Sequence, residues 1–225
     1  LPKGLSRHLV RFAMLSGGVV AVKETTEAMA RREYEMLGNL TRLAVPCVDR
    51  GAVIAGRVDP DDNPLPAALV TAHLKFSLPY RALFQQVLRP DTATRLVDAL
   101  AVLLVRLHNV GFFWGDVSLS NTLFRRDAGA FAAYLVDAET GELPPTLTAG
   151  QRAYDLEVAR VNIIGELMDL VAGELIDTEV DTVAVGASLV ERYTELWDAL
   201  HDEESFGTAE RWRVAERVRR LNELG

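Results

Sequence analysis

The chain has 225 residues, 49% hydrophobic and 25% charged, which is an ordinary globular composition and excludes collagen-like and disordered classes. Its formal net charge of −8 argues against a partner that is a nucleic acid or an anionic membrane surface. The single cysteine, Cys47, excludes an internal disulfide, and the most apolar run, residues 99–105, falls far short of the roughly 20 residues that span a bilayer. We therefore expect a cytoplasmic protein without a membrane span.

The first part of the chain predicts a small antiparallel sheet. Strand-like runs at residues 9–15 and 19–23 flank Ser16-Gly17-Gly18, which is a hairpin-turn signal. Two further strand-like runs, 47–54 and 67–73, follow. They are separated by a proline-rich polar stretch that can be neither a helix nor a central strand.

One helix is predicted within this part, over residues 26–40, with Thr26 or its neighbour Thr25 as the cap. Its apolar stripe includes Met29 and Leu37, and Glu33 lies within that stripe, four residues from each. Glu33 is therefore expected to face inward.

The rest of the chain predicts a mainly helical region. Helices are expected over residues 80–88, 91–109, 150–175, 182–201 and 208–222, and two short strands over 122–124 and 131–136. The expected fold is α+β and bilobal, with an N-terminal lobe over 1–73 and a larger, mainly helical C-terminal lobe over 74–225. The chain begins with Leu1 rather than Met, which allows contacts to further domains of a longer protein.

Five chemically active residues occur in an ordered series along these elements. Lys23 ends a strand, Glu33 lies on the next helix, Asp116 and Asn121 share a loop, and Asp137 follows an apolar strand. Phosphoryl transfer from a nucleotide needs such a set, because it depends mostly on positioning and charge neutralisation. A lysine can hold phosphates, a buried glutamate can keep that lysine extended, and oxygen ligands suit Mg²⁺.

The order and spacing of these residues resemble the protein-kinase-like superfamily. The motifs are Val-Ala-Val-Lys23, Gly-Asp116-Val-Ser-Leu-Ser-Asn121 and Leu-Val-Asp137-Ala-Glu. Their details are most similar to bacterial lipopolysaccharide-kinase-like proteins, notably a branch in the actinobacteria. The resemblance implies an ATP-dependent kinase in which Asp116 is the catalytic base and Lys23, paired with Glu33, anchors the phosphates. Asn121 and Asp137 would hold Mg²⁺ or Mn²⁺.

The same resemblance extends to residues outside these motifs. It implies that main-chain groups of Ala72, His73 and Leu74 form the hinge that meets adenine, and that Arg7 helps to cover the phosphates. It also implies that Asp155 braces the catalytic loop. From the residues alone, we expect His108 and Trp114 to have structural roles. His108 would be a hydrogen-bonded histidine at the end of a helix, and Trp114 would be a core side chain under the loop.

Departures from the family pattern leave alternatives open. The glycine-rich turn is reduced to Gly4, Trp114-Gly115-Asp116 replaces His-Arg-Asp, and Ser118 stands where protein kinases often have lysine. The expected function is phosphoryl transfer to a hydroxyl acceptor, either a sugar or another small molecule. The alternatives are a pseudokinase that senses nucleotide or binds a partner, and a protein-modifying kinase. Taken singly, each residue can also be explained without a function, for example as a solvated surface lysine or an aspartate in a turn.

Overall fold

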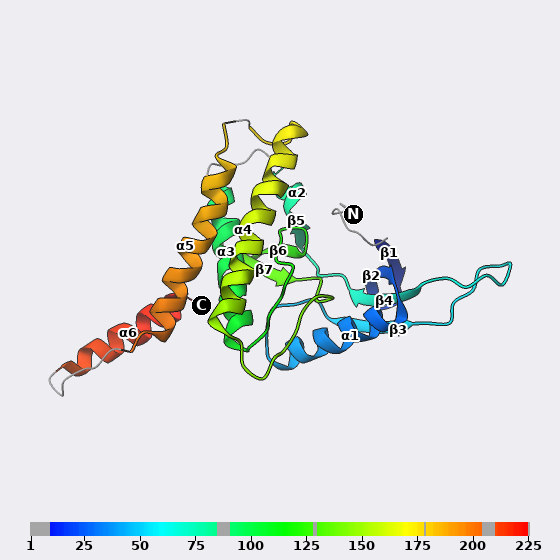
Figure 1. Cartoon of the computed structure of the whole chain (residues 1–225), viewed down its shortest axis with the longest axis horizontal. Coiled ribbons are helices and arrows are strands. Elements are labelled where there is room, and N and C mark those ends of the chain that lie inside the picture. The colour runs from blue at the N-terminus through cyan, green and yellow to red at the C-terminus, as the bar shows by residue number, and fades with distance from the viewer. Residues whose placement is uncertain (1–9, 85–90, 128–129, 178, 204–209, 225) are drawn as a thin grey trace.

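In the computed structural model, the chain folds into a small sheet-bearing lobe and a larger helical lobe (Figure 1). The structure describes residues 10–84, 91–127, 130–177, 179–203 and 210–224. Within these ranges, no helix is long and apolar enough to cross a membrane.

A four-stranded antiparallel sheet forms the small lobe. Its strands are β1 (Val10–Leu15), β2 (Gly18–Thr25), β3 (Arg50–Ile54) and β4 (Ala67–Ala72), in the order β1-β2-β4-β3. Gly18 closes the β1–β2 hairpin with a φ of 131°, a conformation that favours glycine. The expected antiparallel sheet is confirmed. β3 begins at Arg50 rather than at 47, because Cys47 forms an isolated bridge with Leu135 of the larger lobe.

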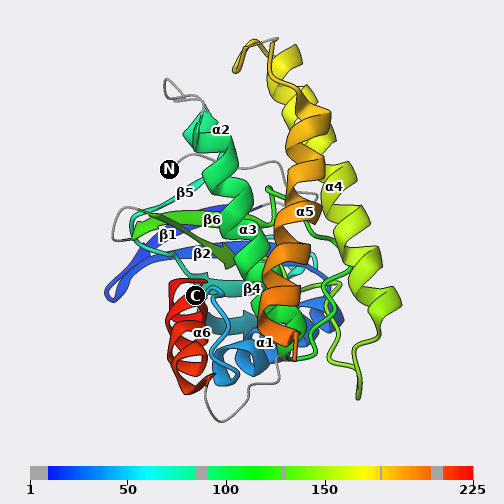
Figure 2. The same ribbon diagram turned by 90° about the vertical axis from the view of Figure 1, so that its left-hand side faces the viewer.

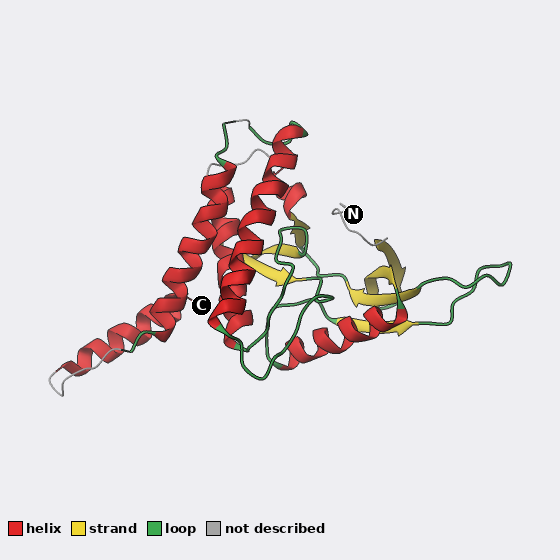
Figure 3. Cartoon of the chain, in the orientation of Figure 1, coloured by secondary structure: helices red, strands yellow, loops and turns green. Residues whose placement is uncertain are grey.

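The helix α1 (Glu27–Arg42) packs against this sheet (Figure 3). The Thr26 side chain accepts a hydrogen bond from the Met29 N–H and caps the helix as expected. Glu33 is 1% exposed and lies among the buried apolar residues of α1, so its predicted inward orientation is confirmed.

Three long helices lie side by side in the larger lobe (Figure 2). They are α3 (Asp91–Asn109), α4 (Ala149–Ala172) and α5 (Thr182–His201), and their packed faces form the core of this lobe. The last helix, α6 (Arg211–Leu224), lies outside the three-helix bundle and runs back toward the end of α5 (Figure 1).

A second, three-stranded sheet connects the two lobes. It consists of β5 (Ser77–Pro79), β6 (Thr122–Asp127) and β7 (Ala130–Leu135) in sequence order, with the short helix α2 (Tyr80–Phe84) directly after β5. The sequence pattern did not predict β5, because three residues ending in proline are too few to show an alternating pattern. Of the predicted helix 80–88, the part beyond α2 lies outside the described residues. This sheet matters for the site because the loop that contains Asp116 leads into β6, and Asp137 follows β7.

Candidate active site

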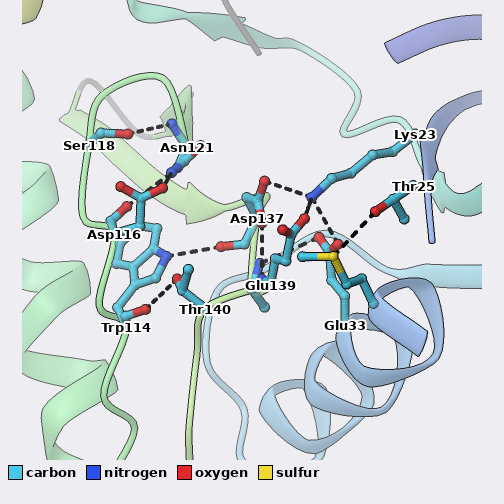
Figure 4. A network of polar contacts seen from close by, with 12 residues as sticks. Lys23, Thr25, Glu33, Trp114, Asp116, Ser118, Asn121, Asp137, Glu139 and Thr140 are labelled. Carbon is cyan, nitrogen blue, oxygen red and sulfur yellow. Dashed lines mark hydrogen bonds and ion pairs between the residues drawn. The ribbon is translucent and has the colours of Figure 1, made fainter. Parts of the chain in front are cut away.

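The ammonium group of Lys23 lies at the centre of three carboxylates (Figure 4). Lys23 Nζ is 2.9 Å from Glu33 Oε2 on α1. It is also 2.8 Å from Asp137 Oδ2 and 2.9 Å from Glu139 Oε2, both in the segment after β7. The cluster thus joins a strand and a helix of the small lobe to the segment that leaves the second sheet.

The charges in this cluster shift one another's pKa values. Burial lowers the pKa of Lys23, but attraction by Asp137 and Glu33 outweighs it and places that pKa above its ordinary value. Burial raises the pKa of Glu33 to about 7, and repulsion by Asp137 adds to the rise, against the attraction of Lys23. One positive charge therefore faces a set of acidic groups that it does not fully neutralise, which favours binding of a further cation.

Asn121 holds the side chain of Asp116 in the loop before β6. Its Nδ2 donates to the Asp116 main-chain oxygen at 2.9 Å and to Asp116 Oδ2 at 3.2 Å. The Asn121 main-chain N–H in turn donates to Ser118 Oγ at 3.1 Å. Because the amide nitrogen of Asn121 is committed to Asp116, the amide oxygen is the end that can ligate a metal ion.

Trp114 connects this loop to the segment that carries Asp137. The Trp114 side chain is completely buried, and its Nε1 donates to the main-chain oxygen of Asp137 at 2.9 Å. Thr140 Oγ1 donates back to the main-chain oxygen of Trp114 at 2.7 Å. Next to this contact, a Cβ on Gly141 would lie 2.3 Å from the ring of Phe112, so glycine is required for the close approach. The predicted core role of Trp114 is confirmed.

Asp155 of α4 accepts hydrogen bonds from the main chain at the start of the loop. Its Oδ2 accepts from the Trp114 N–H at 2.9 Å, and its Oδ1 accepts from the Gly115 N–H at 2.7 Å. His108 Nε2 lies 3.1 Å from the same carboxylate, and His108 Nδ1 lies 2.7 Å from the Tyr193 hydroxyl. His108 is therefore a satisfied structural histidine, and this buried network ties α3, α4 and α5 to the loop.

A pocket opens between the two lobes in front of Lys23. Its polar lining includes Lys23, Glu33, Asn121 and Asp137, and its remaining walls are largely apolar. Asp116 lies beside this pocket rather than in its lining, and is linked to it through Asn121.

The chain segment expected to meet adenine lines the same pocket. The Ala72 and His73 N–H groups are already engaged, because they donate to the main-chain oxygens of Asp49 at 2.8 Å and Val19 at 3.0 Å. The Leu74 N–H has no acceptor among the described residues. Of these three residues, Leu74 is therefore the one whose main-chain donor is available to a ligand in the pocket.

The oxygen atoms around Lys23 fit a divalent metal ion. One carboxylate oxygen from each of Glu33, Asp137 and Glu139 lies within 4.8 Å of the others. Mg²⁺ prefers hard oxygen ligands of this kind. The Asp137 side chain is 26% exposed, whereas that of Glu33 is 1% exposed, so Asp137 is the more accessible ligand. Asn121 and Asp137 both line the pocket, so they form the candidate ligand pair.

The structure therefore brings most of the predicted site residues to one pocket, with Arg7 lying outside the described residues. Sequence reasoning missed Glu139 as a third partner of Lys23, although the Asp137-Ala-Glu triplet contained the signal. It also missed Glu166 of α4, whose carboxylate accepts from the Leu119 and Ser120 N–H groups at 2.8 Å each. Its spacing of eleven residues from Asp155, about three helical turns, would have placed both on one face.

Comparison with solved structures finds "WaaP in complex with acyl carrier protein". The match has a TM-score of 0.58 and 17% sequence identity, and it covers 100% of this chain and 89% of that chain. At this identity the likeness establishes the fold alone, and the fold is kinase-like. A family described as a domain of unknown function (DUF4032) matches residues 195–225, which are the end of α5 and the region of α6. No curated protein matches the chain.

Proposed function

We propose that this protein is an ATP- and Mg²⁺-dependent phosphotransferase that acts on a hydroxyl acceptor. The observation that carries the proposal is the Lys23 ammonium, held 2.9 Å from Glu33 and 2.8 Å from Asp137 at the back of the pocket between the lobes. A buried cation in this position can bind the phosphates of a nucleotide once Asp137 turns to a metal ion.

The loop residues have separate roles in the proposed transfer. Asp116 accepts the proton of the acceptor hydroxyl while the hydroxyl oxygen forms a bond to the γ-phosphorus of ATP. The bond from that phosphorus to the β–γ bridging oxygen breaks, and the electron pair leaves with ADP. Asn121 and Asp137 would hold Mg²⁺, which supplies positive charge to balance the phosphate oxygens.

Adenine recognition is assigned to the hinge. The Leu74 N–H donates to a ring nitrogen of the base, since the Ala72 and His73 N–H groups are bonded within the small lobe. The His73 ring packs edge-on against Phe12, with ring centroids 5.6 Å apart, and this pair borders the adenine end of the pocket. The assigned role of Arg7 in covering phosphates remains a prediction.

A sugar or another small molecule is the proposed acceptor. Only residues 138–148 separate Asp137 from α4, which leaves a short segment where a platform for an extended peptide would be needed. The resemblance of the sequence motifs to lipopolysaccharide-kinase-like proteins agrees with an acceptor of this class. The fold by itself does not specify the acceptor, since 1020 chains of solved structures match it.

A pseudokinase that senses nucleotide is the second candidate function. The observation in its favour is Glu139, which lies 2.9 Å from Lys23 and competes with phosphate for the same ammonium group. In such a protein nucleotide would still bind, but no phosphoryl group would be transferred.

Calorimetric titration with ATP, with and without Mg²⁺, tests the proposal. We expect binding that requires Mg²⁺ and that weakens in Asp137→Asn. The matched control is Asp98→Asn, which removes an exposed carboxylate 3.3 Å from Arg192, on helices α3 and α5. Absence of MgATP binding by the unaltered chain would refute the proposal. Binding without transfer from labelled ATP to any of a panel of sugars and polyols would favour the pseudokinase.

A further inference from the structure

Helix α4 contacts the main chain of the loop 114–121 at three successive points. Asp155 accepts from Trp114 and Gly115, as described above. Asn162 Nδ2 donates to the Val117 main-chain oxygen at 2.9 Å. Farther along the helix, Glu166 contacts the residues directly before Asn121.

The two contacts of Glu166 form a bidentate arrangement. Its Oε2 accepts from the Leu119 N–H and its Oε1 from the Ser120 N–H, each at 2.8 Å. Hydrogen bonds from main-chain N–H groups to a carboxylate are charge-assisted and stronger than neutral ones. One side chain therefore fixes two consecutive peptide groups of the loop.

The spacing along α4 explains how all three contacts arise. Asn162 and Glu166 follow Asp155 by seven and eleven residues, which are about two and about three turns of an α-helix. All three side chains thus leave α4 from nearly the same face. Their partners in the loop follow the same order, so the loop runs alongside the helix.

We propose that Glu166, assisted by Asn162, is a positioning residue for the transfer reaction, because it sets where Asn121 and Asp116 lie. Ser120 is bonded to Glu166 and is the direct neighbour of Asn121. The Asn121 side chain in turn holds the carboxylate of Asp116. The chain of contacts runs from α4 through the loop main chain to the proposed metal ligand and the proposed base.

The buried environment of Glu166 agrees with this role. Burial raises its pKa, and this rise is opposed by the hydrogen bonds from the loop and by the nearby Arg81. The two loop N–H groups and the guanidinium of Arg81 therefore stabilise the ionised carboxylate, which accepts from both N–H groups at once. A glutamine at this position could accept from one N–H only, and its own NH₂ would face the other.

The variant Glu166→Gln tests this inference through amide hydrogen exchange and MgATP binding. We expect exchange of at least one of the Leu119 and Ser120 amides to accelerate about ten- to hundredfold, as loss of a charge-assisted bond implies. Exchange at Trp114 and Gly115 should stay unchanged, because Asp155 still holds them. The Mg²⁺-dependent binding of ATP should weaken as well.

The control is Glu157→Gln on the same helix, whose carboxylate pairs with Arg160 and touches nothing in the loop. It should change none of these quantities. Should Glu166→Gln fold poorly, Asn162→Ala removes a single neutral hydrogen bond and should weaken Mg²⁺-dependent binding less.

Two results would overturn the inference. One is unchanged exchange at Leu119 and Ser120. The other is faster exchange there with unaltered Mg²⁺-dependent binding, which would make Glu166 merely structural. The inference rests on the proposed function for its consequence on binding, but the exchange measurement does not. If the unaltered chain bound no MgATP, the proposed function and this positioning role would both fail, and the exchange data would still show whether Glu166 holds the loop.

Discussion

Replacing Asp155 with asparagine should destabilise the protein and impair its activity together. The Asp155 side chain is completely buried and accepts from two main-chain N–H groups, with His108 as a third neighbour. The asparagine oxygen can retain one of the two N–H bonds, but its NH₂ group then faces the other donor. The substitution therefore removes at least one charge-assisted hydrogen bond and leaves a buried N–H without an acceptor.

The magnitude follows from those two losses. A hydrogen bond to a charged group contributes about 1.5–3 kcal/mol, and an unsatisfied buried group costs about 1–3 kcal/mol. Because these terms overlap, we expect the free energy of unfolding to fall by about 3 kcal/mol. In a chain of this size each kcal/mol lowers Tm by about 2–4 °C, so Tm should fall by about 6–12 °C.

Differential scanning calorimetry measures this shift, with Asp98→Asn as the matched control. Asp98 is an exposed partner of Arg192, and exposed ion pairs contribute about 0–1 kcal/mol. A Tm of Asp155→Asn within about 2 °C of the unaltered protein would refute the reasoning, because it would mean that the loop does not depend on this carboxylate.

Three further predictions concern the base, the buried glutamate and the close approach at Gly141. Asp116→Asn should lower phosphoryl transfer by about 10²–10⁴-fold with Tm nearly unchanged, and a variant that retains full turnover would exclude Asp116 as the base. Burial raises the pKa of Glu33 to about 7, above its ordinary value of 4.5, so the folded protein binds the proton more tightly and stability should fall as pH rises from 4.5 to 7. This contribution is about 3 kcal/mol at most, and urea denaturation of Glu33→Gln between pH 5 and 8 should show a flatter profile; equal slopes would contradict the assignment. Gly141→Ala should lower stability by about 1–3 kcal/mol, because the added methyl group meets the Phe112 ring, and an unchanged denaturation midpoint would show that the ring can move aside.

The small lobe could be predicted from local patterns in the sequence. Its first two strands flank a glycine turn, and α1 has both a cap and an apolar stripe, so short-range physics determines these elements. The position of Glu33 within that stripe was enough to place its carboxylate inside. The short strand β5 could not be found in this way, because its existence depends on pairing with β6, which lies far away in the sequence.

The candidate site, like the fold, could be predicted from the sequence only in part. The residue types of Lys23, Asp116, Asn121 and Asp137 indicated phosphoryl-transfer chemistry, because that chemistry needs a cation, a base and oxygen ligands. Their order along the chain added the resemblance to the protein-kinase-like superfamily. Only the tertiary structure decided which groups share the Lys23 ammonium and that Glu139 is among them. It alone also revealed that Glu166 of α4 holds the loop. Such contacts join segments distant in the sequence, and their geometry is set by packing of the whole core rather than by local propensity.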